Sequence, residues 1–179
     1  NIISWLALFH KFGWSQEYAD ERKFILYKIS EKTNYSEQDI ETVIRELKER
    51  KVLQGDKTLY ISPRLLHIRA WVWWWQEYGN SFDLGSMKQA TYNGETIEMS
   101  SELYDWFAQM FEYAREVEGA SDVVRRLLTL DGPLSNEPEL MEALSGSFFR
   151  SLALADPENA LLFLEHWLGS KTDEQLRLV

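Results

Sequence analysis

The segment between Pro63 and Gly79 constrains the fold more than any other, because it holds four of the chain's eight tryptophans. Proline is favoured where a helix begins and glycine just beyond its end, so the segment is predicted to be one helix of about four turns. Successive helical residues are rotated by about 100°, so the four indoles cannot share one face. We therefore expect a helix that is buried on more than one side and joins the two halves of the chain. The structural spine expected from this segment consists of Trp71, Trp73, Trp74 and Trp75.

The same segment is polar at few positions. Arg69 and Gln76, seven residues apart, mark one narrow polar stripe. His67 and Arg69 interrupt the apolar run well short of the roughly 20 residues that a membrane-spanning helix needs. No membrane association is therefore expected.

The composition predicts a folded chain without cysteine chemistry. Its 179 residues suit one domain or two small ones, and we expect two. With 45% hydrophobic and 14% aromatic residues it is too apolar for a disordered chain. The absence of cysteine excludes disulfides and zinc–thiolate sites, and no signal-peptide pattern opens the chain, so a cytoplasmic location is expected. The first residue is not Met, as expected of a piece of a longer polypeptide.

The formal charge of −10 is unevenly distributed. Residues 1–79 carry 12 Lys and Arg against 11 Asp and Glu, whereas residues 80–179 carry 7 against 18. The acidic second half repels phosphate backbones, so nucleic acid is not an expected partner of that half.

Residues 1–79 are predicted to form a winged-helix domain that ends in the tryptophan-rich helix. Apolar residues at helical spacing indicate a first helix over 2–12, and Asp20 can cap a second. Ser36 marks the clearest helix start, because its side chain can accept a backbone N–H from the following turn.

A β-hairpin comes after the third helix. The hydrophobic period changes to two in residues 52–61, on either side of a polar turn that contains Gly55. Three helices followed by a hairpin are typical of a winged helix. A three-helix bundle with a chance hairpin is the alternative.

The third helix is a poor match to a DNA-reading helix. Many winged helices lay this helix in the major groove, and it is then basic. Between Glu37 and Arg50 the helix instead carries five acidic and three basic residues. Basic residues do gather beyond its end and around the hairpin, and a solvated charged face is the more common explanation for such a pattern. The candidate interface or phosphate contacts among them are Lys51, Lys57, Arg64 and Arg69.

Residues 80–100 are predicted to be an irregular loop, in which Asn93-Gly94 favours a small hairpin. Residues 101–179 are predicted to form a helical, repeat-like domain. One of its helices ends at Asp131-Gly132-Pro133, and Asp156 followed by Pro157 begins another. The last unit, from Thr172 onward, ends in apolar residues, as if the helical array continued.

Catalytic and ligand-binding motifs are missing from the sequence. Gly55-Asp56-Lys57-Thr58 lacks the spacing of a phosphate-binding loop. His10, His67 and His166 are far apart and none has a second ligand one helical turn away, so metal binding is not expected. We expect no catalytic, cofactor-binding or metal-binding residue and no enzymatic activity in this chain.

Two stretches carry a more specific pattern of core and turn residues. The first runs from Lys51 to Ile68 and from Trp74 to Gly79, and the second from Gly132 to Leu161. The first resembles the segment that comes after the nucleotide-binding core in bacterial STAND-type P-loop ATPases, the signalling NTPases related to NACHT and AP-ATPase proteins. The second resembles the helical region that comes next in those proteins. The stretch from Leu84 to Met99 departs from that pattern because it is longer.

This resemblance implies a regulatory role in a larger ATPase. The nucleotide site would lie in an upstream domain, and this chain would relay nucleotide state to a downstream sensor, in defence or regulated cell death. The implied partners are the upstream nucleotide-binding domain and downstream repeats of the same polypeptide, with a homo-oligomer also compatible. The alternatives are a winged-helix transcription regulator with a helical dimerisation region, and a scaffold that holds a partner peptide in an aromatic groove.

Overall fold

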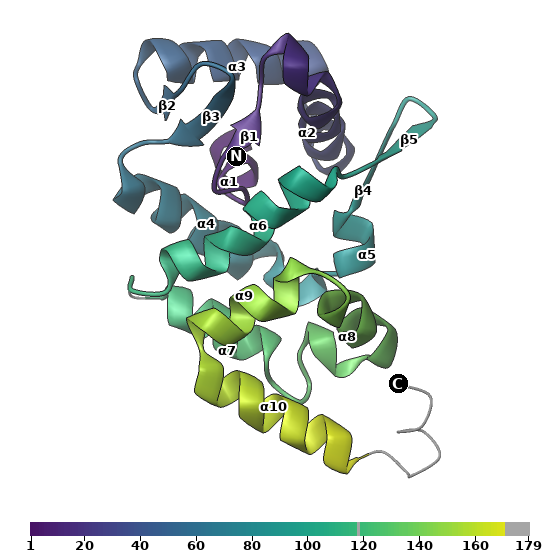
Figure 1. The fold of residues 1–179 in the computed structure, drawn as a ribbon. Helices are drawn as coiled ribbons and strands as arrows, with labels where there is room; N and C mark the ends of the chain where they lie inside the picture. The colour runs from purple at the N-terminus through teal and green to yellow at the C-terminus, as the bar shows by residue number, and fades with distance from the viewer. Residues whose placement is uncertain (118, 171–179) are drawn as a thin grey trace.

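The computed structural model describes residues 1–117 and 119–170, and the chain is mainly helical (Figure 1). Two small antiparallel sheets accompany the helices, one with three strands and one with two. The expectation of a mainly α-helical fold is confirmed.

The first 61 residues alternate helices with short strands. Strand β3 lies at the centre of the first sheet, between β1 and β2. The predicted hairpin is present as β2 and β3, and Ser36 caps α3 as expected by accepting the backbone N–H of Asp39. The elements in order are α1 (Ile2–Leu6), β1 (Phe12–Gly13), η1 (Gln16–Tyr18), α2 (Ala19–Lys32), α3 (Glu37–Glu49), β2 (Leu53–Gln54) and β3 (Thr58–Ile61).

The first helix is much shorter than predicted. It ends at Leu6, and Phe12 and Gly13 pair with Leu59 and Thr58 of β3. Residue 12 is therefore not helical, because a backbone group bonded within a sheet cannot also extend a helix. Gly13 leaves no room for a side chain, since an added Cβ would lie 2.2 Å from Cβ of residue 18. The second helix begins two residues earlier than a cap at residue 20 requires, so that residue 20 lies in its first turn and does not cap it.

Helix α4 (Arg64–Tyr78) comes directly after Pro63 and ends at Gly79, as predicted. Trp71, Trp74 and Trp75 are buried, whereas Trp73 is 38% exposed. Residues three and four apart share a helix face, which groups the three buried indoles, while Trp73 lies two residues from two of them and faces the other way. Trp73 is therefore outside the buried part of the expected spine.

The stretch from 80 to 100 is more ordered than the predicted irregular loop. It contains η2 (Gly79–Ser81), α5 (Leu84–Met87) and a hairpin made of β4 (Gln89–Tyr92) and β5 (Glu95–Glu98). The turn has positive φ at both central residues, 51° at Asn93 and 81° at Gly94, as a tight hairpin turn requires. The hairpin packs on α2, which gives it a partner that local sequence signals do not reveal.

The C-terminal part is helical as predicted, but α7 ends at Leu127, before the predicted end at Asp131-Gly132-Pro133. Asp156 caps the last helix and Pro157 is its first residue, as predicted. The final unit expected from Thr172 onward lies outside the described residues. The elements are α6 (Ser101–Ala114), α7 (Ala120–Leu127), η3 (Pro133–Ser135), α8 (Glu137–Leu144), α9 (Ser147–Ala155) and α10 (Pro157–Gly169).

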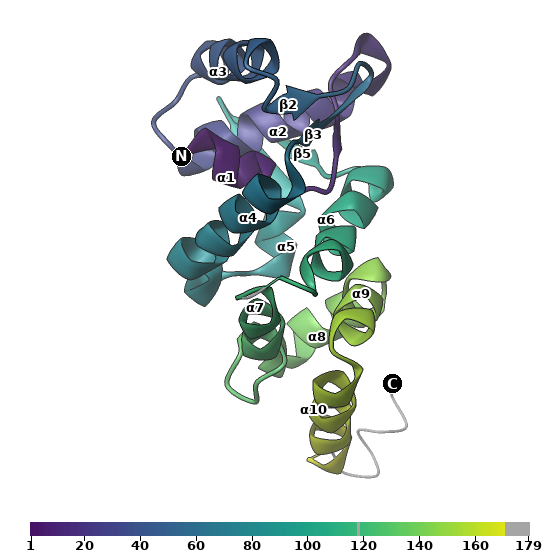
Figure 2. The ribbon, with the colours of Figure 1, turned by 90° about the vertical axis from the view of Figure 1, so that its left-hand side faces the viewer.

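Helices α4 and α6 lie side by side at mid-height, with α1, α2 and α3 above them and α7 to α10 below (Figures 1 and 2). Their contact is aromatic, because Phe111 of α6 meets the edge of Trp71 of α4 at 5.2 Å between ring centroids. One hydrophobic core runs through both parts of the chain.

Helix α2 adds a polar connection between the two parts. Its Glu21 is 5% exposed and accepts hydrogen bonds from the backbone of Gly13 and the hydroxyl of Ser100. Its Lys28, 3% exposed, donates to the carbonyl oxygens of Ser86 and Gln89, each at 2.6 Å. Burial raises the pKa of Glu21 and lowers the pKa of Lys28. These charges are tolerated because each one is hydrogen-bonded.

We predict that Lys28→Met lowers the free energy of unfolding by about 2 kcal/mol, because it leaves the part-buried carbonyl oxygens of Ser86 and Gln89 without their donor. Lys32→Met is the matched control, since Lys32 is four residues further along the same helix with a side chain 41% exposed. Its effect should stay within about 0.5 kcal/mol. Urea titrations followed by tryptophan fluorescence measure both, and equal effects of the two substitutions would contradict the structural role of Lys28.

Candidate functional site at the junction of the two parts

The N-terminal part (residues 1–79) and the C-terminal part (residues 101–170) meet along α4 and α6, here called the junction. The backbone N–H of His10 donates to the carbonyl of Trp106 at 2.9 Å. The guanidinium of Arg64 donates to the carbonyl of Tyr113 at 2.7 Å and lies over its ring, 4.7 Å from the centroid. Main-chain and side-chain contacts therefore fix the two parts against each other.

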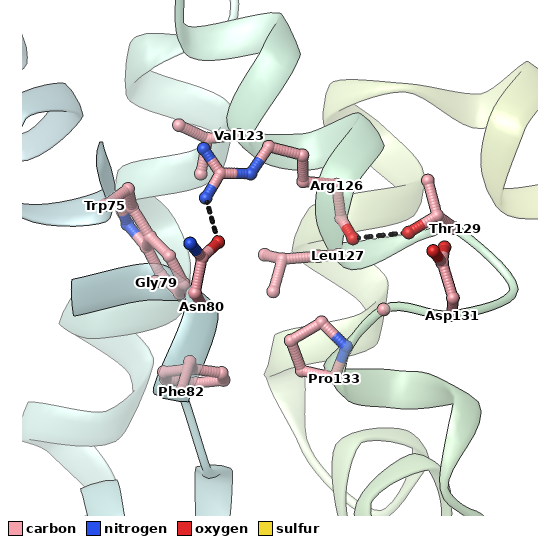
Figure 3. Close-up of a pocket in the computed structure, with 11 residues that line it drawn as sticks. Trp75, Gly79, Asn80, Phe82, Val123, Arg126, Leu127, Thr129, Asp131 and Pro133 are labelled. Carbon is pink, nitrogen blue, oxygen red and sulfur yellow. Dashed lines mark hydrogen bonds between the residues drawn. The ribbon is translucent and has the colours of Figure 1, made fainter. Parts of the chain in front are cut away.

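A pocket of about 320 Å³ opens at the end of this junction (Figure 3). One side is formed by the last turn of α4 with η2, and the other by α7 and the turn after it. We call it the junction pocket. Its lining mixes apolar with polar groups, and the apolar side chains come from Trp75, Phe82, Val123, Leu127 and Pro133.

The polar groups of the junction pocket lie on both sides. Arg126 of α7 reaches across to η2 and donates to Oδ1 of Asn80 at 2.8 Å (Figure 3). Asp131 and Thr129 lie in the turn after α7. Among the described residues that line the pocket, Arg126 is the one cationic side chain and Asp131 the one anionic side chain.

The turn after α7 is held in a tight conformation. The hydroxyl of Thr129 donates to the carbonyl of Arg126 at 2.9 Å, and the backbone N–H of Gly132 donates to the carbonyl of Thr129 at 3.0 Å. A side chain at Gly132 would collide with this arrangement, because an added Cβ would lie 2.5 Å from the carbonyl oxygen of Arg126. The geometry of the pocket wall therefore depends on glycine at 132.

Two side chains at the junction pocket have N–H groups without an acceptor among the described residues. Arginine has five N–H donors, and within residues 1–117 and 119–170 the only hydrogen-bond partner of the Arg126 side chain is Asn80. The indole N–H of Trp75 is buried and has no acceptor among those residues. Its ring meets Phe82 at 4.8 Å and Phe111 at 5.7 Å between centroids, so the indole sits in aromatic surroundings.

The four basic residues selected from the sequence do not share one environment. Lys57 forms an ion pair with Glu17 at 2.6 Å, and this contact raises the pKa of Lys57. Arg64 is engaged with α6, as described above. Lys51 and Arg69 are exposed, and their side chains have no hydrogen-bond or ion-pair partner in the part of the chain that the structure describes.

Two histidines that are far apart in the sequence lie close together at the junction. His10 and His67 lie 4.6 and 5.6 Å from the ring of Tyr113, measured between centroids. His67 is 1% exposed, and its Nε2 lies 3.2 Å from the carbonyl oxygen of Ala7. Burial lowers the pKa of His67 to about 4, and burial with the neighbouring Lys11 also lowers the pKa of His10. Both rings are therefore neutral at pH 7.

The described ranges contain neither a metal cluster nor a membrane-spanning helix. No three His, Asp or Glu side chains of residues 1–117 and 119–170 are placed to hold a metal ion. In the same ranges no helix has the length and apolar character needed to cross a bilayer.

Comparison with known proteins gives no relative. No family model matches the sequence, and no curated protein or solved structure matches it significantly. The function therefore has to be argued from the residues and their arrangement.

We predict that the free energy of unfolding falls between pH 7 and pH 5, in part through His67. Its folded pKa, about 4, is below its ordinary value of 6.5, so the unfolded chain binds a proton that the folded chain does not. Stability is then full above pH 6.5 and is lost as the pH falls toward 4. At pH 5 the loss from this group is about 2 kcal/mol.

His67→Gln should remove that loss, since glutamine does not titrate and can still donate to Ala7. His166→Gln, which replaces an exposed histidine on α10, is the control and should keep the wild-type pH dependence. Urea unfolding at the two pH values measures the difference. A pH dependence that is the same in wild type and His67→Gln would contradict the assignment.

Proposed function

We propose that this chain is a non-catalytic regulatory and interaction module of a larger cytoplasmic signalling ATPase. In this proposal it combines a winged helix with a helical region and relays nucleotide state from an upstream NTPase domain to a downstream sensor. It holds no cofactor itself.

The order of the first elements supports a winged helix in residues 1–61. The chain runs helix, strand, two helices and two strands, and the last strand lies between the other two. This is the arrangement that a helix-turn-helix core with a β-hairpin wing requires. The resemblance of Lys51 to Ile68 and of Trp74 to Gly79 to STAND ATPases concerns this same region.

The observation that carries the proposal is the position of α4. This helix leaves the hairpin at Pro63 and packs through Trp71 and Trp75 on Phe111 of α6. A relay must transmit a displacement without absorbing it, and close-packed interiors have low compressibility. An upstream domain that moves the hairpin end of α4 would thereby move the helical part with it.

Two exposed apolar surfaces support partners within a longer polypeptide. The outer face of α4 carries Leu65, 58% exposed, and Trp73. Helix α10 exposes Leu161 and Leu162 by 58% and 56%. Clustered exposed apolar side chains mark interaction sites. We assign the α4 face to the upstream domain and the α10 face to downstream repeats.

The test uses the longer polypeptide that the proposal requires. A Walker A loop should be encoded upstream of residue 1, and Leu65→Glu with Trp73→Glu should change ATP turnover by about fivefold or more, the usual size of allosteric coupling. Gln38→Glu, which adds charge to an exposed position on α3, is the control and should leave turnover unchanged. An upstream sequence without an NTPase domain would refute the proposal. So would an ATP turnover that is unchanged in the Leu65→Glu, Trp73→Glu double variant.

The second candidate is a winged-helix transcription regulator with a helical dimerisation region. The observation in its favour is the same element order, with Lys51 and Arg69 exposed beside the hairpin and α4. Against it, the first turn of α3, where a reading helix contacts bases, carries Glu37 and Asp39.

We expect no saturable binding of a short fluorescent DNA duplex tighter than about 10 µM at physiological salt in an anisotropy titration. Tight, salt-sensitive binding that weakens in the Lys51→Glu, Arg69→Glu double variant would instead establish the second candidate.

A further inference from the structure

The junction pocket has the features of a small-molecule site, independently of the role proposed for the whole chain. Ligand pockets usually measure about 300 to 1,000 Å³, lie where two units meet, and combine an apolar lining with a few polar groups. The junction pocket, at about 320 Å³, is at the lower end of this range, lies between η2 and the turn after α7, and carries polar groups next to its apolar side chains. Its size suits a compact organic molecule.

The polar group that sets the ligand class is Arg126. Its guanidinium lies at the upper edge of the pocket in Figure 3 and donates one hydrogen bond within the described residues, to Asn80. Arginine pairs with carboxylates through two parallel N–H···O bonds, which suits a carboxylate better than a single neutral acceptor. The remaining donors of Arg126 are therefore placed to hold a carboxylate.

The rest of the lining limits the ligand further. Phe82 and Pro133, both partly exposed, provide apolar surface, whereas Trp75 and Leu127 line the pocket but are each only 2% exposed (Figure 3). Asp131, the one acidic side chain among the described lining residues, opposes additional negative charge. A molecule with several phosphates would meet this carboxylate with only one arginine to offset it. The pocket thus favours a single negative charge on an apolar body.

We propose that the junction pocket binds a small organic monocarboxylate whose apolar body is about the size of an aromatic ring system. The carboxylate pairs with Arg126, and the body packs against Phe82 and Pro133. Such a ligand contacts η2 and the turn after α7 together, so its binding stabilises the arrangement of the two parts.

The test measures binding of 3-phenylpropionate and of indole-3-acetate to the full chain by calorimetry and by ¹⁵N NMR of the indole N–H groups. Wild type should bind at least one of these saturably and shift the Trp75 indole signal, which a Trp75→Phe variant identifies. The matching amides, 3-phenylpropionamide and indole-3-acetamide, should bind at least about tenfold more weakly, because they lack the charge that Arg126 recognises.

Two arginine variants then locate the site. Arg126→Gln should weaken carboxylate binding at least about tenfold. Arg125→Gln removes the same charge from the neighbouring position of α7, where the side chain is 61% exposed and faces Asp122 at 3.7 Å, and it should leave binding unchanged. The comparison of acid with amide needs no variant, so it decides the proposal even if Arg126→Gln folds poorly.

Three outcomes overturn the proposal. One is that neither acid binds saturably below about 5 mM. Another is that acids and amides bind equally, which would make the site purely apolar. The third is that Arg125→Gln and Arg126→Gln weaken binding to the same extent, which would show a general effect of charge. None of these outcomes depends on an upstream ATPase domain.

Discussion

The contact of Phe111 with its aromatic neighbours holds the two parts of the chain together. Its ring lies 5.2 Å from Trp71 and 5.7 Å from Trp75 of α4, and 5.1 Å from Phe148 of α9. Each contact is edge-to-face, the geometry that aromatic quadrupoles favour. Because Phe111 has no exposed surface, every helix that touches it is fixed relative to the others. The junction is therefore part of the hydrophobic core, and the two parts do not meet as separate surfaces.

The polar contacts of α2 determine where the segment from 80 to 100 lies. Apolar packing alone tolerates small shifts of a hairpin, whereas a buried charge must meet its partners at hydrogen-bond distance. Lys28 donates to two carbonyl oxygens of this segment, and Tyr27 donates to Glu95 at 2.9 Å. Glu21 does the same at the start of α6 through Ser100. In this chain the aromatic core holds the two parts together, and the charged side chains of α2 fix the position of the segment from 80 to 100.

The sequence predicts the elements whose signals are local and misses those that depend on distant partners. Pro63 and Gly79 bound α4 correctly, because helix capping acts within a few residues. The strand at Phe12 is missed because its partner, Leu59, lies far along the chain, while its own neighbourhood has helical spacing. The junction pocket likewise has one feature that is predictable from local signals and one that is not. The end of α4 is predictable from Gly79, but the approach of Arg126 to Asn80, 46 residues apart, depends on tertiary packing. The histidines near Tyr113 are missed for the same reason.

The shared core also limits how a signal can pass through this chain. Aromatic contacts continue from α4 through Phe111 and Phe148, and Phe149 of α9 lies 6.4 Å from Phe163 of α10. Contact alone does not couple two sites, because coupling needs an element with two discrete arrangements. The close-packed core that joins the part ending at residue 79 to the part beginning at residue 101 does not supply such an element. If the chain relays a change of state, it moves as a single body, and the exposed faces of α4 and α10 are where that movement is received and passed on. The junction pocket borders this body at the turn after α7, so a ligand bound there adds to its stiffness and does not open it.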